Sequence, residues 1–187
     1  MAIAKRKKRF FDVEIPIINK QTNLQAYELK ELEGKFIKYD LTRILRGKSM
    51  LIQLKVKIEN DRAVAIPREI KLMPYFLRRM VRKGTNYIED SFSTNCKDAQ
   101  IRIKPFLITR RKVSRAVRKA LREKAREELI NYVKDKNIEI LFEELLKNQL
   151  QKPLSLKLKK IYPLSLCEIR VFKVEKEIKE KSTKKKE

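Results

Sequence analysis

The chain has 187 residues, with 48 Lys and Arg against 24 Asp and Glu, which gives a formal net charge of +24 and a pI of about 10.1. Charged residues make up 39% of the chain, where an ordinary globular domain has about 25%. A compact body with this imbalance repels itself. The composition therefore predicts a polyanionic partner, with nucleic acid as the first candidate and an anionic membrane surface as the second.

Scarce residue types exclude several classes of chemistry. The chain has no His, which rules out Ser-His-Asp triads, Cys-His dyads and His-ligated metal sites. Its three Gly cannot build a Gly-rich phosphate loop, and its two cysteines, Cys96 and Cys167, are too few for a zinc cluster. We expect two reduced thiols, with a single disulfide as the alternative. No metal, no cofactor and no enzymatic activity are expected.

The termini differ from the rest of the chain in composition. Residues 1–9 form a basic arm whose cations are Lys5, Arg6, Lys7, Lys8 and Arg9. Residues 175–187 form a charged tail of low complexity, and both segments are expected to be mobile without a partner. The single body between them, residues 10–174, keeps a net charge of +17. Asp12 and Glu14 interrupt the apolar stretch that a signal peptide needs, so a cytoplasmic protein without a membrane span is expected.

The first half of the body predicts antiparallel strands. Residues 10–15 alternate partly, residues 35–45 form a second apolar stretch, and residues 49–58 alternate most clearly, from Met50 to Ile58. A short strand over 63–66 is expected to end at a sheet edge, because Pro67 has no N–H group to donate. A short helix follows, from Pro74 to a stop at Gly84. Residues 87–95 and 99–108 then predict a hairpin.

The second half predicts mainly helices. Residues 113–135 contain no Gly or Pro and are rich in helix-forming residues. A second, more acidic helix is expected over 138–151 and a third from Pro153, before a last strand over 164–174. The fold class is therefore α+β, an antiparallel sheet with several packed helices.

The strongest functional signal is a run of cations that no acid interrupts. Its members are Arg110, Arg111, Lys112, Arg115, Arg118, Lys119 and Arg122. At 100° per residue four of them, Arg111, Arg115, Arg118 and Arg122, are expected in one stripe, opposite Val113, Val117, Ala120 and Leu121. Cations at a helix N-terminus oppose the helix dipole, so the stripe indicates an external anion. A solvated helix face is the alternative.

Further cations join the candidate nucleic-acid contacts. The short helix carries Arg78, Arg79, Arg82 and Lys83, and turns and strand ends carry Arg43, Arg46, Lys48, Arg102 and Lys104. Arg suits bidentate contact with phosphate. Stacking on bases is one role open to the aromatic residues near these cations, and core packing or interface filling is the expected role for most of them. They are Tyr39, Tyr75, Tyr87 and Phe106. No set of carboxylates resembles a two-metal nuclease.

The residues from Ile161 to Arg170, I-Y-P-L-S-L-C-E-I-R, resemble the closing motif of ribosomal proteins of the S3Ae family of archaea and eukaryotes. Similar matches are the segment from Leu77 to Arg82, the run from Arg102 to Pro105 with Arg110 and Arg111 after it, and Gly34-Lys35-Phe36 with Asp40-Leu41 after it. Their order holds from Phe10 to Val174.

The resemblance implies a non-enzymatic protein with a β-barrel-like body and helices packed around it. It also implies binding to rRNA on the platform of the small ribosomal subunit, near the mRNA exit region. The expected partners are small-subunit rRNA, neighbouring proteins of that subunit and mRNA, and Arg170 of the closing motif joins the candidate RNA-binding residues.

Three alternatives to a structural ribosomal protein follow from the residues. An RNA processing or assembly factor acting outside the mature ribosome is disfavoured as an enzyme by the absence of His. A DNA-binding regulator needs a helix-turn-helix pair, which the strand-rich first half does not offer. A membrane-surface protein needs bulky apolar residues opposite the cations, and Val113, Ala116 and Ala120 are small.

Overall fold

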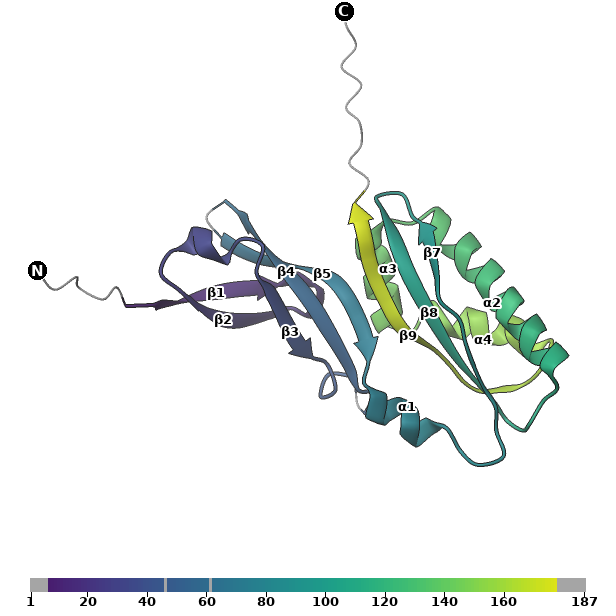
Figure 1. Ribbon diagram of the computed structural model, residues 1–187. Helices are drawn as coiled ribbons and strands as arrows, with labels where there is room; N and C mark the ends of the chain where they lie inside the picture. Colours follow the sequence, from purple (N-terminus) through teal and green to yellow (C-terminus); the bar gives the residue numbers. More distant parts are fainter. Residues whose placement is uncertain (1–6, 46, 61, 178–187) are drawn as a thin grey trace, which may run out of the picture.

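The computed structural model describes residues 7–45, 47–60 and 62–177 and has an α+β fold (Figure 1). Within these residues, nine strands form one sheet and four α-helices pack around it. The strands are β1 (Arg9–Ile15), β2 (Lys20–Ala26), β3 (Phe36–Asp40), β4 (Met50–Glu59), β5 (Arg62–Leu72), β6 (Tyr87–Glu89), β7 (Phe92–Asn95), β8 (Ala99–Thr109) and β9 (Leu164–Glu177). The helices are α1 (Pro74–Met80), α2 (Arg115–Lys134), α3 (Ile138–Leu146) and α4 (Gln151–Lys159), with 3-10 turns η1 (Pro16–Ile18) and η2 (Leu29–Leu32).

Strand β5 joins the two halves of the sheet. On one side it pairs with β4 along its length. On the other side its first residues pair with β1, in parallel, and its last residues pair with β9. Strand β9 then pairs with β8, whose far edge is shared by β7 and β6.

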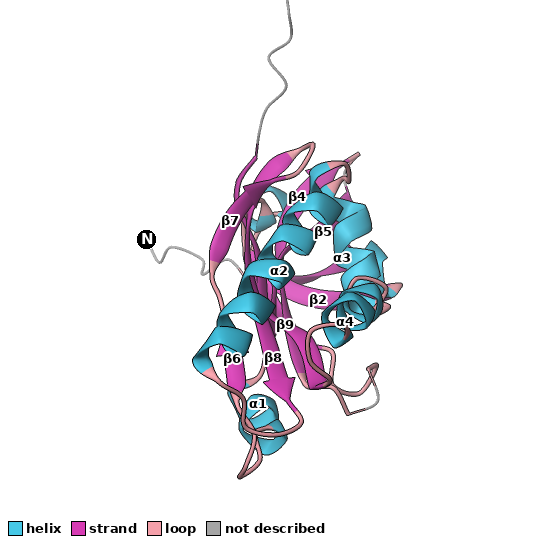
Figure 2. Cartoon of the chain, turned by 90° about the vertical axis from the view of Figure 1, so that its right-hand side faces the viewer, coloured by secondary structure: helices cyan, strands magenta, loops and turns pink. Residues whose placement is uncertain are grey.

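The sheet is open, so the prediction of a barrel-like body is wrong. Strand β2 ends the branch that runs from β5 through β1, β3 ends the branch through β4, and β6 and β7 share the far edge of β8. No pairing within the described residues closes the ring. The reason is the way in which the apolar face is covered. Helices α2, α3 and α4 lie over the part of the sheet that β7, β8 and β9 form (Figure 2), so helices bury the strands without a second layer of sheet.

The core lies between these helices and the sheet. Phe142 of α3 and Phe172 of β9 are both fully buried and meet edge to face, with ring centroids 5.0 Å apart. On α2 the buried residues recur every four positions, at Leu121, Ala125, Leu129 and Val133. Burial of each large apolar side chain contributes about 1.5–3 kcal/mol to folding. These contacts fix α2 on the sheet and thereby the direction of its first turn.

Several predicted elements are confirmed. The alternation over 49–58 corresponds to β4, where Met50, Ile52, Leu54 and Val56 are completely buried. The long helix is α2, and the last strand is β9. Both cysteines are free, as predicted. None of the described helices has the length and hydropathy that a membrane span needs.

The prediction that a strand ends at Pro67 is wrong, because β5 continues to Leu72. The predicted edge position of Pro67 holds locally, on one side of β5. Pro67 opposes Leu54 at a bulge between β4 and β5. On its other side β5 has no described partner strand between Val64, which pairs with β1, and Glu69, which pairs with β9. No ladder hydrogen bond therefore depends on the N–H group that Pro67 lacks.

Other boundaries also shift. Strand β2 was not predicted. Arg9 begins β1, and residues 175–177 complete β9, so these residues belong to strands and not to the predicted arm and tail. The helix predicted over 138–151 is α3, which ends at Leu146. Asn148 adopts a left-handed conformation with φ 58° and separates α3 from α4. Lys5, Arg6, Arg46 and residues 178–187 lie outside the described residues.

Candidate nucleic-acid interface

Helix α1 and the segment after it carry the first group of exposed cations. Phe76 and Leu77 are buried and anchor the helix, while Arg78 and Arg79 are exposed. The helix ends at Met80, so Arg82 and Lys83 lie in the following segment and not on the helix as predicted. Gly84, at φ +86°, allows this segment to turn back toward β6.

The segment between β8 and α2 carries the second group. Arg110, Arg111 and Lys112 are all exposed. Ser114 is the N-cap of α2, where its Oγ accepts a hydrogen bond from the Val117 N–H at 3.4 Å. Helix α2 therefore begins at Arg115, and Arg111 precedes it.

The predicted stripe of four Arg on one helical face is therefore wrong. Arg111 precedes the helix, and Arg118 does not lie on the predicted exposed face. Arg118 is three residues before the buried Leu121 and therefore lies on the face that α2 packs against the sheet. Arg118 is half-buried, and its Nε is enclosed without a hydrogen-bond partner in the part of the chain that the structure describes. Ala120, predicted on the buried face, is exposed. Arg115 and Arg122 remain exposed as predicted.

A cluster of hydrogen bonds joins the two basic segments. The fully buried Thr109 accepts a hydrogen bond at Oγ from the Asn86 N–H at 3.1 Å, and its Oγ lies 2.7 Å from the Arg111 carbonyl oxygen, to which it can donate. The Thr109 N–H donates to the Asn86 carbonyl at 2.9 Å. The Asn86 side-chain oxygen accepts from the Val113 N–H at 2.8 Å. These bonds hold residues 82–86 against residues 109–113.

The cations that this cluster gathers lie at one end of the molecule, where Figure 2 shows α1, β6 and the first turn of α2 together. We call this surface the basic end, and it comprises Arg78, Arg79, Arg82, Lys83, Arg110, Arg111, Lys112 and Arg115. Among the described residues, no carboxylate lies within 4.0 Å of any of these cationic groups. The sequence explains this, because residues 70–88 and 99–122 contain no Asp or Glu.

Two aromatic side chains are exposed beside these cations. Tyr75 of α1 is 46% exposed and Tyr87 of β6 is 56% exposed. Tyr87 stacks its inner side on Phe106, with ring centroids 6.1 Å apart. Phe106 is buried and Tyr39 half-buried, so the prediction of core packing holds for these two only.

Three predicted site residues have internal partners. The Lys48 Nζ lies 2.6 Å from Glu168 Oε2 and 2.7 Å from Asn148 Oδ1, and its side chain is only 12% exposed. The Arg102 Nε lies 2.6 Å from Glu175 Oε1. The Arg170 Nη1 donates to both carboxylate oxygens of Glu89 at 3.0 Å. These ion pairs connect strands, so the three residues do not offer free cations.

The remaining predicted residues are not part of the basic end. Arg102, Lys104 and Arg170 line a groove on the uncovered face of the sheet, with a volume of about 690 Å³, together with Glu89 and Glu175. That groove has mixed charge. Other candidates are exposed, namely Arg43, Lys7, Arg9, Lys119 and Lys8, with the Lys8 Nζ 5.6 Å from the Tyr27 ring centroid. Lys119 is in a weak, exposed pair with Glu123 at 3.7 Å.

Sequence reasoning missed Asn86, Thr109 and two further cations. Lys159 and Lys160, at the end of α4, are exposed. Shortly after them, the Pro163 carbonyl accepts a hydrogen bond from the Arg110 N–H at 3.4 Å, which brings this loop to the basic end. The only local sequence signal for the Thr109–Asn86 hydrogen-bond cluster is a Thr at the end of an apolar strand, directly before two Arg. Nothing in the sequence predicts that this Thr contacts Asn86.

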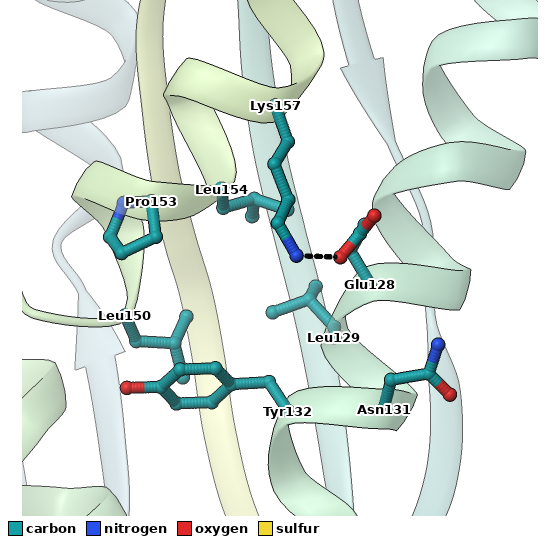
Figure 3. A pocket seen from close by; sticks show the side chains of 8 residues that line it. All are labelled: Glu128, Leu129, Asn131, Tyr132, Leu150, Pro153, Leu154 and Lys157. Carbon is teal, nitrogen blue, oxygen red and sulfur yellow. Dashed lines mark hydrogen bonds and ion pairs between the residues drawn. The ribbon is translucent and has the colours of Figure 1, made fainter.

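The second half of α2 has a different surface. Glu128 forms ion pairs with Lys124 of α2, at 3.5 Å, and with Lys157 of α4, at 2.5 Å. Hydrogen bonds from these two lysines, Lys157 first, lower the pKa of Glu128. Beneath the second pair lies a pocket of about 210 Å³ lined by Leu129, Leu150 and Leu154 (Figure 3). These contacts join α2 to α4. The acids of α2 lie in its second part, so the basic part of this helix is its N-terminal part.

The features that define the class of this protein are an open α+β sheet and a carboxylate-free cationic end. The described residues also contain no group of three or more Cys, Asp or Glu able to hold a metal ion. A model of the ribosomal S3Ae family matches residues 4–178, and the chain belongs to this family. The expectations of this family and of a protein that is not an enzyme are thereby confirmed.

Curated relatives agree with the family. The small ribosomal subunit protein eS1 of Nanoarchaeum equitans is 26% identical over 178 residues, which cover 91% of this chain and 90% of that protein. The eS1 proteins of Pyrobaculum islandicum and Pyrobaculum arsenaticum are 27% and 26% identical. Those alignments cover 88% and 73% of this chain, and 72% and 63% of the two relatives.

Proposed function

We propose that the chain is a structural component of the small ribosomal subunit and that its basic end binds rRNA. The observation that carries this proposal is the set of eight exposed cations without a carboxylate partner within the described residues. The partners are then rRNA and neighbouring proteins of the subunit, in the cytoplasm. The family resemblance further supports a location on the platform near the mRNA exit region, with mRNA as an additional contact.

The chemistry of the basic end suits folded RNA. Arg guanidinium groups donate two parallel hydrogen bonds to phosphate, and each neutralised phosphate releases counterions. Exposed Tyr75 and Tyr87 offer rings on which unpaired bases can stack. Because the cations lie on two segments that cross, they match closely spaced phosphates of folded RNA, and recognition depends on RNA shape more than on base sequence.

The start of α2 also favours an anion. Its first turn contains Arg115 and Arg118 and no acid, and a cation near a helix N-terminus costs roughly 0.3–1 kcal/mol. A phosphate bound there interacts favourably with both the helix dipole and the guanidinium groups. The free protein therefore retains an unfavourable charge arrangement that RNA binding relieves.

The test compares two sets of substitutions that change the net charge equally. Arg78→Gln, Arg82→Gln, Arg110→Gln and Arg111→Gln remove cations from the basic end. Lys20→Gln, Lys38→Gln, Lys57→Gln and Lys97→Gln are the control, because these residues are exposed and lie outside it. In sucrose gradients, we expect the first variant to leave the small-subunit fractions while the second remains with the wild type.

Two results would contradict the proposal. Equal loss from both variants would show that net charge alone matters. Co-sedimentation of the wild type only with precursor particles would favour the alternative, an RNA processing or assembly factor outside the mature ribosome.

A further inference from the structure

A groove at the edge of β5 has a composition opposite to that of the basic end. It lies between α3 and β5, with η1 at one side, and has a volume of about 330 Å³. Its floor is apolar, with Ile17, Ile66 and Pro67, and its rim carries Glu59, Glu139 and Glu143. No described Lys or Arg lines it, although Lys57 and Arg68 line the adjoining groove, which shares Ile66, Pro67 and Glu139. In a chain with a net charge of +24, such a surface calls for an explanation.

The rim carboxylates are largely unpaired. Glu143 forms an exposed ion pair with Lys147 at 2.9 Å. Glu59 and Glu139 are exposed, and neither has an ion pair or side-chain hydrogen bond among the residues that the structure describes. The chain holds two cations for each acid, so cationic partners were available, yet no described Lys or Arg forms an ion pair with Glu59 or Glu139. The unpaired carboxylates therefore indicate a cation supplied from outside.

The backbone beside the groove pairs with β4 on one side, and among the described residues its other side has no partner strand after Val64 and before Glu69. Four consecutive residues of β5, 64–67, line it, as is expected of a groove that runs along the edge of a strand and not over one face. Within the described chain, β1 pairs with β5 only up to Val64 and β9 only from Glu69. The stretch between them offers an edge to an incoming extended segment.

We propose that this groove binds an extended basic segment of another protein, which places an apolar side chain on the floor and Lys or Arg side chains at the rim. RNA is disfavoured as the occupant because the carboxylates repel phosphates. Neighbouring residues add to this repulsion: residues 10–34, which include η1, contain five acids and two cations, a net charge of −3. The inference goes beyond the proposed rRNA contact and uses none of its residues.

The first experiment measures fluorescence anisotropy of a labelled peptide, Lys-Ile-Lys-Val-Lys-Ile-Lys, with the full chain. Repulsion by the net positive charge opposes binding elsewhere on the protein. The double variant Glu59→Gln and Glu139→Gln removes two exposed ion pairs between the protein and the lysines of the bound peptide. We therefore expect the affinity for the peptide to fall about fivefold. The control, Glu123→Gln with Glu127→Gln, changes two exposed glutamates of α2 and should leave affinity unchanged. The rRNA affinity of the first variant should not fall, which separates this proposal from the proposed function.

Three results in this experiment would overturn the proposal. They are equal weakening by both variants, equal binding of a Glu-Ile-Glu-Val-Glu-Ile-Glu peptide, and no binding of the basic peptide at millimolar concentration. A dimer in sedimentation equilibrium that Glu59→Gln with Glu139→Gln dissociates would also overturn it, because a second copy would then fill the groove.

The second experiment places a photo-crosslinking amino acid at position 17 in assembled small subunits. A crosslink to a protein segment rich in Lys and Arg supports the proposal. A crosslink to rRNA, or to an acidic protein segment, overturns it. If the chain failed to assemble, the rRNA proposal would fail while the peptide experiment would still decide the occupant of the groove.

Discussion

The hydrogen bonds of Thr109 predict that a neutral substitution weakens RNA binding. Thr109→Val keeps the shape of a fully buried side chain but removes the hydroxyl that lies between the Asn86 N–H and the Arg111 carbonyl. Leaving a buried polar group without its partner costs about 1–3 kcal/mol. Because Asn86 is half-buried and Arg111 is exposed, we take the lower end for each group, about 2 kcal/mol in total. For a chain of this size that corresponds to a decrease in Tm of about 4–8 °C.

The same change should reduce rRNA affinity, by about three- to tenfold, because the two basic segments are no longer held together. The number of cations is unchanged, so the slope of log K against log salt should stay the same. Thr22→Val is the matched control, since Thr22 is a half-buried strand residue without a described side-chain hydrogen bond. Circular dichroism melts and anisotropy titrations at several salt concentrations measure both effects. A loss of stability with unchanged RNA affinity would refute the reasoning, as would equal effects from Thr22→Val.

Three further predictions concern charge and the thiols. Wild-type rRNA affinity should fall with salt with a log–log slope of about −0.7 to −0.9 per phosphate contact, and a nearly flat isotherm would contradict it. The triple variant Arg110→Gln, Arg111→Gln and Arg115→Gln should keep Tm within about 2 °C, since these three Arg are exposed, and it should reduce that slope by about 2–3. A large loss of stability would show that these residues support the fold. Burial raises the pKa of Cys167 to about 12, so its alkylation at pH 8 should be slow in the native protein. After denaturation, both cysteines should be labelled. Fast labelling of native Cys167 would contradict this prediction.

The sequence was sufficient for elements that a local pattern specifies. Strand β4 places Met50, Ile52, Leu54 and Val56 on its buried face, and this period of two is visible without any partner strand. Helix α2 follows from helix propensity alone, because residues 115–134 contain neither Gly nor Pro. The free cysteines and the family were also predictable, the latter from motifs spread along the chain.

Long-range partners were not predictable. Lys48 is engaged by Glu168, which lies 120 positions away in the sequence, and Arg170 by Glu89. No local pattern distinguishes these cations from exposed ones such as Arg111. The open sheet was missed for a similar reason, since closure depends on whether helices or strands cover the apolar face. The position of Arg118 on the buried face of α2 could have been read from its spacing to Leu121.

The basic end and the acidic groove between α3 and β5 show that the charge of this protein is segregated and not merely large. Residues 99–122 contain nine Lys or Arg and no acid, whereas residues 10–34 have a net charge of −3. A uniformly basic particle would attract RNA in many orientations, but a segregated one is oriented by the field of the RNA before contact. We expect the basic end to meet phosphate and the surfaces around η1 and α3 to face other partners. Asn86 and Thr109 fix the basic segments and β5 joins both halves of the sheet, so we expect the fold to give the protein a defined orientation on RNA.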